Sequence, residues 1–209
     1  MTKSLVILLH GVGARGADLE PLGDALRAYL PSTLFIAPDA PEPFDQGGPI
    51  RQWFSVTGVT AANRPQRVEV ARAGFDAIIR DAVETQGFRD RLDQVAFVGF
   101  SQGAIMALDA VASGRWSVAA TVAFAGRLAS PPPLSPAGIT RALLVHGAAD
   151  TVIPAWESEE AYARLHQAGA DVSLHVLPGV GHFITPDGIA LAGAFLRRIF
   201  GREDLARQV

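Results

Sequence analysis

Apolar residues occur along this chain in two kinds of block. Short blocks are apolar at nearly every position, as in buried strands, and longer blocks have apolar residues at helical spacing. The short blocks predict strands at Ser4–Leu9, Thr33–Ala37, Gln94–Phe100, Val118–Ala125, Ala142–Val145 and Val172–Leu177. The longer blocks predict helices at Leu19–Tyr29, Val68–Thr85, Gln102–Ala112, Pro154–Gln167 and Gly188–Phe200. Wholly apolar strands that alternate with helices are typical of a mostly parallel sheet. We therefore predict an α/β fold, with about six or seven strands and helices on both faces.

The right-handed crossovers of such a sheet bring the carboxyl ends of all its strands to one edge. Ligands bind outside that edge. Chemistry is therefore expected in the residues that directly follow each strand. One long segment, Pro43–Pro65, fits neither pattern and carries Trp53 and Phe54 in its middle. A loop of this length in a compact domain more often covers a site than merely connects two elements.

Size and composition narrow the class of protein. The chain has 209 residues, of which 49% are hydrophobic and 19% are charged. These values predict one domain over residues 1–209 and exclude a disordered chain. The formal net charge of −3 is too small to attract nucleic acid or an anionic membrane. The absence of cysteine excludes thiol nucleophiles, thiolate metal sites and disulfides.

Targeting signals are also missing from the sequence. The apolar run Leu5–Leu9 stops at His10-Gly11, which is too early for a secretion signal. No apolar stretch approaches the ~20 residues of a membrane span. We therefore expect a soluble cytoplasmic protein without a stable membrane anchor or a nucleic-acid partner.

The strongest chemical signal is the pentapeptide Gly99-Phe100-Ser101-Gln102-Gly103, which matches the pattern G-x-S-x-G. It lies between a predicted strand and a predicted helix. In that context a sharp turn holds the serine in a strained backbone conformation with its hydroxyl group projecting from the sheet. The residues two before and two after the serine must be tiny, because the turn packs their Cβ positions against neighbouring backbone. Ser101 is therefore the candidate nucleophile.

A nucleophilic serine needs a histidine base and an acid that orients this base. With this type of turn the order along the chain is serine, acid, histidine. Asp150 and His182 satisfy that order, and each follows a predicted strand. Both side chains are therefore expected at the edge of the sheet that carries Ser101.

The other histidines are weaker candidates for the base. His166 lies within a predicted helix, and His175 lies within a predicted strand. His146 ends a strand but precedes Asp150 too closely to be expected to turn toward it. His10 comes before the serine and is better suited to shaping a loop.

Two backbone N–H groups are expected to form an oxyanion hole. The N–H of Gln102 lies at a helix N-terminus, where unbonded donors and the helix dipole favour negative charge. The second candidate is the N–H of Val12 in His10-Gly11-Val12-Gly13, because the flanking glycines let the main chain approach a substrate.

The same glycines also match a nucleotide-binding pattern. The segment Gly11–Gly16 has the form G-x-G-x-x-G, and Asp39 follows the second strand, where a ribose-binding acid would lie. In that fold the helix begins inside the motif, whereas here the helical signals begin at Asp18 and Pro21 lies in the first turn. Nucleotide binding would also leave the serine, acid and histidine positions unexplained.

Four segments resemble the phospholipase/carboxylesterase family of α/β-hydrolases, which includes small bacterial carboxylesterases and acyl-protein thioesterases. The segments are LLHGVGARGADLEPLGDAL, GFSQGAIMALDAV, LLVHGAADTVIP and GVGHFITPDGIALAGAFL. The resemblance implies a single α/β-hydrolase domain without a separate lid domain. It also implies roles for five residues: Ser101 as nucleophile, Asp150 as acid, His182 as base, and Val12 and Gln102 as oxyanion donors.

The resemblance extends to the long segment, with two departures. Family members carry a Trp-Phe pair near the acyl site, and Trp53-Phe54 matches it. Ser55 stands where the family usually has an acidic residue, and Ala14 stands where it often has aspartate. These departures leave the catalytic positions intact but bear on substrate preference.

Together the observations predict a serine esterase that cleaves carboxylic esters of short to medium acyl chain through an acyl-enzyme, without metal or organic cofactor. Candidate substrate walls, each equally suited to core packing, are Trp53, Phe54, Ile153 and Phe183. Acyl-protein thioesterase or lysophospholipase activity is the alternative, and a dinucleotide-binding oxidoreductase or a non-catalytic binding protein is more distant. The partner is a small-molecule ester; the sequence leaves its identity open, as it does the choice between monomer and homodimer.

Overall fold

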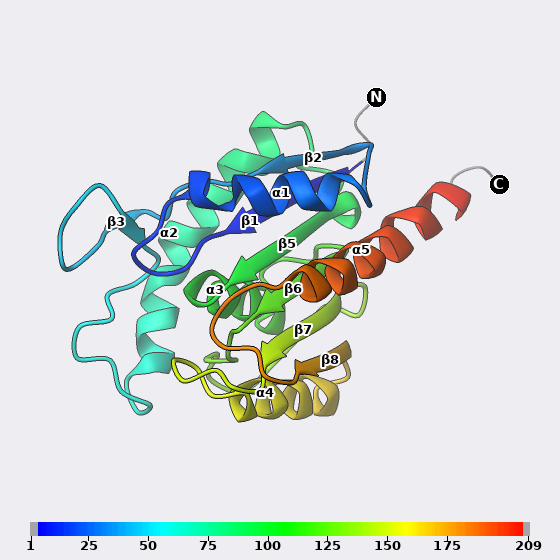
Figure 1. Cartoon of the computed structure of the whole chain (residues 1–209). Coiled ribbons are helices and arrows are strands. Elements are labelled where there is room, and N and C mark those ends of the chain that lie inside the picture. Colours follow the sequence, from blue (N-terminus) through cyan, green and yellow to red (C-terminus); the bar gives the residue numbers. More distant parts are fainter. Residues whose placement is uncertain (1–3, 207–209) are drawn as a thin grey trace.

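The structure, a computed structural model, describes residues 4–206. In this range six strands form one sheet in the order β2-β1-β5-β6-β7-β8, with every neighbouring pair parallel. The strands are β1 (Ser4–Leu9), β2 (Thr33–Ile36), β5 (Val95–Phe100), β6 (Ala120–Phe124), β7 (Arg141–Gly147) and β8 (Asp171–Leu177). Their arrowheads lie along one edge of the sheet (Figure 1). The predicted strands and the predicted parallel sheet are confirmed.

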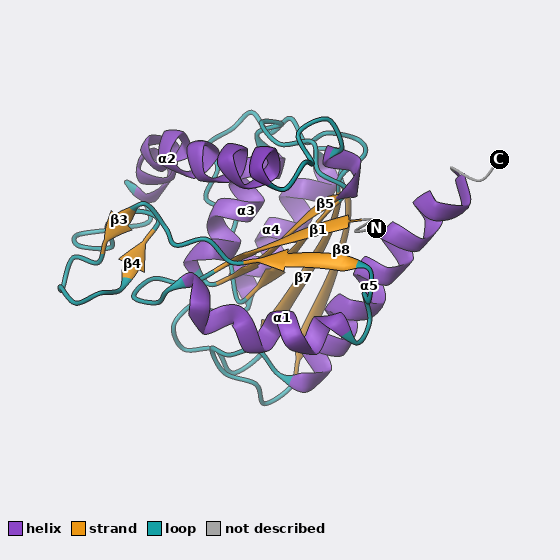
Figure 2. Cartoon of the chain, turned by 90° about the horizontal axis from the view of Figure 1, so that it is seen from above, coloured by secondary structure: helices purple, strands orange, loops and turns teal. Residues whose placement is uncertain are grey.

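Helices cover both faces of this sheet. They are α1 (Glu20–Arg27), α2 (Arg64–Thr85), α3 (Gln102–Ala112), α4 (Trp156–Gln167) and α5 (Pro186–Ala206). Short 3₁₀ helices, η1 (Gly16–Leu19) and η2 (Leu92–Gln94), precede α1 and β5. Figure 2 shows α1 and α5 on one face and α2, α3 and α4 on the other. All five predicted helices are present, and α3 has the predicted bounds.

The two faces explain why the strands are apolar throughout. In β1, Leu5, Ile7 and Leu9 join the core under α2 and α3, while Val6 and Leu8 join the core under α1 and α5. Successive side chains of a strand point to opposite faces, so a strand buried on both faces needs apolar residues at every position.

The segment Pro43–Pro65 is more regular than the sequence indicates. Its beginning contributes to a small antiparallel pair formed by β3 (Glu42–Pro43) and β4 (Arg51–Gln52), and α2 begins at its end. Strands of two residues carry no readable periodicity, which is why the pair escapes prediction.

A single carboxylate holds the exposed part of this segment together. Asp45 accepts hydrogen bonds from Gln52 Nε2 at 2.7 Å, Ser55 Oγ at 2.7 Å and Thr57 Oγ1 at 2.9 Å. These bonds, first of all the one from Gln52, hold the pKa of Asp45 well below its usual range. The segment is therefore tied by an ionised side chain, and Ser55 is one of its donors.

Helix α3 is anchored by a buried ion cluster. Asp109, in the middle of α3, has a fully buried carboxylate that contacts Arg72 of α2 at 2.9 Å and Arg115 at 2.8 Å. Ser130 Oγ donates a further hydrogen bond to this carboxylate at 2.7 Å. Removing one member of such a cluster leaves an uncompensated buried charge, which typically costs about 3–5 kcal/mol. The helix that follows Ser101 therefore has a fixed position.

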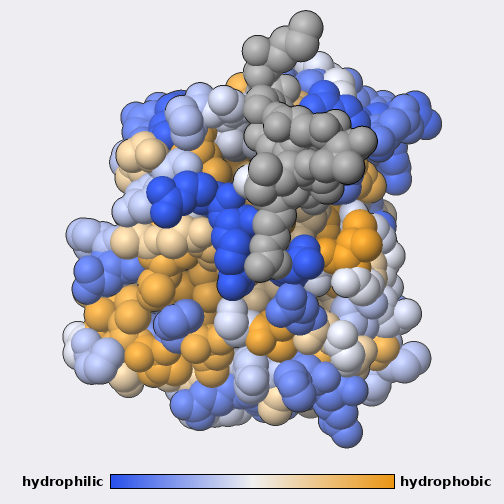
Figure 3. Space-filling view, turned by 90° about the vertical axis from the view of Figure 1, so that its right-hand side faces the viewer, coloured by the Kyte–Doolittle hydropathy of each residue, from blue (hydrophilic) through white to orange (hydrophobic). Residues whose placement is uncertain are grey.

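The sheet ends at β8, whose side chains are less buried than those of the inner strands. Val172, Leu174 and Val176 are only partly covered. Apolar residues gather over the lower half of the side of the molecule on which the strands begin (Figure 3). No helix formed by residues 4–206 combines the length and apolar character needed to cross a bilayer.

Candidate active site

Ser101 lies at the predicted sharp turn between β5 and α3. Its backbone has φ 52° and ψ −115°, a left-handed conformation that residues other than glycine rarely adopt. A Cβ atom at Gly103 would lie 2.1 Å from the Leu9 carbonyl oxygen, and one at Gly99 would lie 2.6 Å from the backbone of Ala104. The expectation that both positions must lack a side chain is confirmed.

His182 and Asp150 lie in line with this serine. His182 Nε2 is 3.0 Å from Ser101 Oγ, and His182 Nδ1 is 2.7 Å from Asp150 Oδ2. A carboxylate only accepts hydrogen bonds, so Nδ1 carries the proton and Nε2 is left to accept the serine proton. The imidazole also packs against the Phe100 ring, with 5.0 Å between the ring centroids. The three residues predicted from separate strand ends are therefore in contact.

Two loops are joined so that Asp150 and His182 meet. The N–H of Ala148 donates to the Leu177 carbonyl at 2.9 Å, and the N–H of Ala149 donates to the Val180 carbonyl at 2.8 Å. Gly147 allows this approach, because a Cβ there would lie 2.2 Å from the Val180 oxygen. The ends of β7 and β8 are thus bonded together just before each functional side chain.

Asp150 is buried but remains a good acceptor. Its Oδ1 accepts hydrogen bonds from the N–H groups of Val152 at 2.8 Å and Ile153 at 2.9 Å. Burial by itself raises the pKa of Asp150, but the hydrogen bonds from His182, Ile153 and Val152 outweigh it and lower this pKa below its ordinary value. The carboxylate facing His182 is therefore charged.

The sequence interpretation of His146 is wrong. His146 does turn toward Asp150, with Nε2 3.1 Å from Oδ2. The reason is a tight turn in which the N–H of Asp150 donates to the Gly147 carbonyl at 3.2 Å, so the chain reverses between the two residues. The glycine directly after His146 is the signal that could have indicated such a turn.

Val12 and Ser101 follow adjacent strands, β1 and β5. Chain order reverses between these two strands, because β2 lies on the other side of β1. Such a switch point is where parallel sheets bind ligands. The loops that carry the two expected oxyanion donors therefore flank this crevice.

His10 holds the loop that contains Val12, as the sequence suggests. Its Nδ1 is 2.7 Å from the Gly11 carbonyl oxygen, and its Nε2 accepts a hydrogen bond from the N–H of Ala40 at 3.0 Å. The carbonyl can only accept, so Nδ1 carries the single proton of a neutral ring. Burial lowers the pKa of His10, which favours this neutral form.

The Gln102 side chain is a functional feature that the sequence interpretation missed. Its Oε1 accepts a hydrogen bond from the N–H of Trp53 at 2.8 Å, and its Nε2 donates to the Phe54 carbonyl at 2.7 Å. The Trp53 indole N–H donates to the His10 carbonyl at 2.9 Å. Gln102 therefore ties the long segment to the turn at Ser101, and Trp53 ties it to the loop after β1. The backbone pattern gives no sign of either link.

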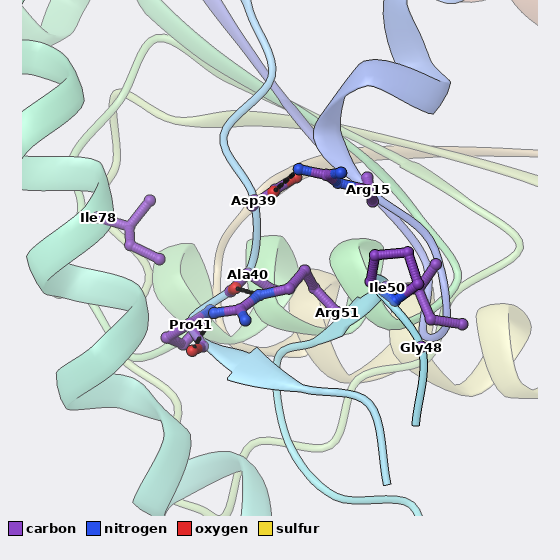
Figure 4. A pocket seen from close by; sticks show the side chains of 9 residues that line it. Arg15, Asp39, Ala40, Pro41, Gly48, Ile50, Arg51 and Ile78 are labelled. Carbon is purple, nitrogen blue, oxygen red and sulfur yellow. Dashed lines mark hydrogen bonds and ion pairs between the residues drawn. The ribbon is translucent and has the colours of Figure 1, made fainter. Parts of the chain in front are cut away.

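Arg51 connects the same segment to the Val12 loop. Its backbone pairs with Gly13 and Ala14, with both N···O distances at 2.9 Å. Its guanidinium group donates to the carbonyl oxygens of Ala40 and Pro41. Figure 4 shows these bonds at a surface pocket of about 450 Å³.

Three of the four candidate substrate walls lie in the core. Trp53 is 1% exposed, and Phe54 and Ile153 are each 5% exposed. Phe183, next to His182, is 57% exposed. Val152 and Trp156, which follow Asp150, are also mostly exposed. Exposed apolar side chains thus follow both Asp150 and His182 in the chain.

The nucleotide-binding alternative has no support in this geometry. The Asp39 carboxylate accepts a hydrogen bond from the N–H of Gly16 at 2.8 Å and pairs with Arg15 at 3.1 Å (Figure 4). The Asp39 carboxylate is therefore engaged in stabilising the turn at Arg15 and Gly16.

The helical segment begins earlier than predicted. The 3₁₀ helix η1 begins at Gly16, where Asp18 accepts a hydrogen bond from the Arg15 N–H at 2.8 Å, whereas α1 itself begins at Glu20.

Comparisons with known proteins agree with this geometry. A family model described as Phospholipase/Carboxylesterase matches residues 1–200. The chain is 34% identical to esterase YpfH of Escherichia coli (strain K12), over 93% of this chain and 82% of that protein. It is 23% identical to acyl-protein thioesterase 1 homolog 1 of Dictyostelium discoideum, over 94% and 90% of the two chains. The crystal structure of esterase PE8 matches with a TM-score of 0.81 and 36% identity, covering 95% of this chain and 93% of that chain. This chain belongs to the phospholipase/carboxylesterase family.

Proposed function

We propose that this ester hydrolase works through Ser101, His182 and Asp150 as a catalytic triad. The observation that carries the proposal is the unbroken hydrogen-bond chain from Ser101 Oγ through the His182 ring to Asp150 Oδ2. Such a chain lets the imidazole accept the hydroxyl proton while the carboxylate stabilises the resulting cation. The nucleophile, base and acid come from the loops after β5, β8 and β7, as the α/β-hydrolase order requires.

The reaction has two halves. Ser101 Oγ attacks the ester carbonyl carbon while its proton passes to His182 Nε2, which gives a tetrahedral intermediate. The bond to the leaving alcohol then breaks, and the alcohol takes the proton from Nε2. Water attacks the acyl-enzyme in the same way, giving its proton to Nε2, and the acid is released as Ser101 regains a proton.

Backbone donors stabilise the intermediate. The Gly11–Val12 peptide is planar and trans, so its C=O and N–H point in opposite directions. Because His10 holds the Gly11 carbonyl on one side, the Val12 N–H points to the other side, and we place the oxyanion at this N–H. The Gln102 N–H opens α3 next to Ser101 and supplies the second donor. Losing one such donor typically lowers turnover about 10²–10³-fold.

The substrate class follows from the surface around the triad. Phe183, Val152 and Trp156 give the catalytic loops an apolar exterior, which suits the acyl or alcohol part of a carboxylic ester. We propose esters of short to medium acyl chain as substrates. The likeness to a protein named as an acyl-protein thioesterase adds acyl thioesters as a second class to test.

Ser101→Ala is the direct test. We expect a fluorophosphonate probe to label the wild-type protein and not this variant, and kcat on p-nitrophenyl esters to fall about 10⁴–10⁶-fold. Ser135→Ala, which changes an exposed serine, serves as the matched control and keeps wild-type labelling. Equal labelling of wild type and Ser101→Ala would refute the assignment. Rates on esters of increasing acyl length, beside an acyl thioester, then decide between the substrate classes.

A further inference from the structure

We propose that His146 is a positioning residue for the triad: it donates a hydrogen bond to Asp150 and so fixes the carboxylate that orients His182. This inference rests on the proposed function. His146 is buried, and the hydrogen bonds of its ring are with Ser158, Asp150 and Ile153, so its route to the reaction is the bond to Asp150.

The direction of the bond follows from the neighbours of His146 Nε2. This atom lies 2.7 Å from the Ile153 carbonyl oxygen and 3.1 Å from Asp150 Oδ2. Both neighbours only accept hydrogen bonds, so Nε2 must carry a proton and share it between them. The tautomer is therefore set by the turn that also presents the N–H groups bound to Asp150 Oδ1.

The other side of the ring is fixed as well. His146 Nδ1 lies 2.6 Å from Ser158 Oγ on α4, and this hydroxyl lies 3.2 Å from the Gly126 carbonyl oxygen. The Gly126 carbonyl can only accept, and the hydroxyl has a single proton, so this proton lies on one of the two bonds while Ser158 Oγ remains the partner of Nδ1. Every polar atom of the His146 ring thus has a partner, which removes its rotational freedom and makes it a rigid support.

Asp150 consequently has its charge divided among four donors. Oδ1 is held by two backbone N–H groups, while Oδ2 is shared by His182 Nδ1 and His146 Nε2. Without the His146 donor, Oδ2 would keep only the bond from His182 Nδ1 among the described residues, and its position would be less restricted. The negative charge of Oδ2 would then be compensated by one donor fewer, so its attraction for the His182 ring would be stronger.

The charged and titratable groups around His146 come from four elements. Asp150 and His182 follow β7 and β8. Arg127, after β6, acts electrostatically on Asp150 and is paired at 2.7 Å with Glu157 of α4. None of these groups changes in the variants below, so a change in pH profile reports on position 146.

Two substitutions at His146 separate its two ring nitrogens. The amide of glutamine can place an N–H where histidine has Nε2, so His146→Gln keeps a donor for Asp150. The shorter amide of asparagine reaches only the Nδ1 position, so His146→Asn keeps the contact with Ser158 and loses the one with Asp150. His175→Asn, at an exposed position of β8, is the control for the substitution itself.

We expect His146→Asn to lower kcat about tenfold with KM unchanged, because a hydrogen bond to a charged group is lost and the orientation of His182 is affected rather than substrate binding. The acid limb of its kcat/KM profile moves to higher pH, since the less shared carboxylate holds the His182 cation more strongly. The downfield proton resonance of the His182 Nδ1–H moves in the same variant. His146→Gln restores kcat to within about threefold of wild type.

Two results would overturn the proposal. One is a folded His146→Asn protein with wild-type kcat and pH profile. The other is an equal loss of kcat in both variants that follows their melting temperatures while the acid limb and the proton resonance stay in place, because that pattern is the mark of a structural role. Failure of the triad assignment is distinguishable: Ser101→Ala would then keep its labelling, and the resonance would still decide whether His146 acts on Asp150.

Discussion

Gln102, the residue after the proposed nucleophile Ser101, combines a proposed backbone role with a side-chain role. The backbone N–H of Gln102 is the proposed oxyanion donor, while its side-chain amide bonds both the N–H of Trp53 and the carbonyl of Phe54. The side chain is 2% exposed, so its bonds are not in competition with water. One residue thereby joins the start of α3 to a segment that lies 48 residues earlier in the chain.

Gln102→Met tests this link, because methionine has a similar length and no hydrogen-bonding amide. We expect the free energy of unfolding to fall by about 2–4 kcal/mol, since two backbone groups remain buried without partners. Urea denaturation measures the change. Gln66→Met, at an exposed position of α2, should change it by less than about 0.5 kcal/mol. Similar values for both variants would show that the Gln102 side-chain bonds contribute nothing to stability.

At this scale the sequence predicts some side chains and not others. Ser101, Asp150 and His182 could be found because a turn motif and strand ends place them by backbone position alone. His146 and the Gln102 amide could not, because their roles depend on where a tight turn or a distant loop sends a side chain. The sequence leaves Trp53 and Phe54 open between substrate contact and core packing, because their burial depends on the same Gln102 side-chain bonds.

At the scale of elements, the turn between β5 and α3 depends on the absence of a side chain at Gly103. Gly103→Ala adds one methyl group that would lie 2.1 Å from the Leu9 carbonyl oxygen, so β1 and α3 must separate. We expect a loss of about 3 kcal/mol or more in unfolding free energy, together with reduced turnover. Thermal and urea denaturation with ester assays measure both effects.

Gly138→Ala is the matched control for this change. A Cβ at Gly138 meets no atom within 4 Å, so its effect should stay within about 1 kcal/mol. If Gly103→Ala were as stable and active as Gly138→Ala, close packing of β1 against α3 would not be the reason for glycine at this position.

The main elements were predictable because each is long enough to show its period and is buried on a defined face. The pair β3–β4 was not, since it has two residues per strand and is stabilised by Arg51 and Asp45 rather than by an apolar face. The helical start at Gly16 also escaped prediction, because it is set by a backbone N–H bound to Asp39.

At the scale of the whole molecule, His10 links stability to pH. The native structure lowers the pKa of His10 from its ordinary value of 6.5. Below about pH 6.5, His10 in the unfolded chain therefore binds a proton more readily than His10 in the native structure. The stability that the neutral His10 contributes is complete above about pH 6.5 and is lost as the pH falls from there through the native pKa.

The variant His10→Gln removes this titration while keeping an acceptor for the Ala40 N–H. We expect the melting temperature of the wild-type protein to fall more steeply than that of His10→Gln as the pH is lowered from about 7.5 to 5.5. Groups that titrate elsewhere affect both proteins alike. Parallel curves would mean that burial of His10 is not coupled to acid sensitivity.

The direction of the sheet also settles where other polypeptides can be joined to this one. All six strands of the sheet point toward the edge that carries Ser101, whereas β1 starts and α5 ends at the opposite edge (Figure 1). A fusion partner or an affinity tag joined before β1 or after α5 would therefore lie on the side of the molecule opposite Ser101. Immobilised through such a tag, the enzyme would present Ser101, its proposed nucleophile, to the passing solution.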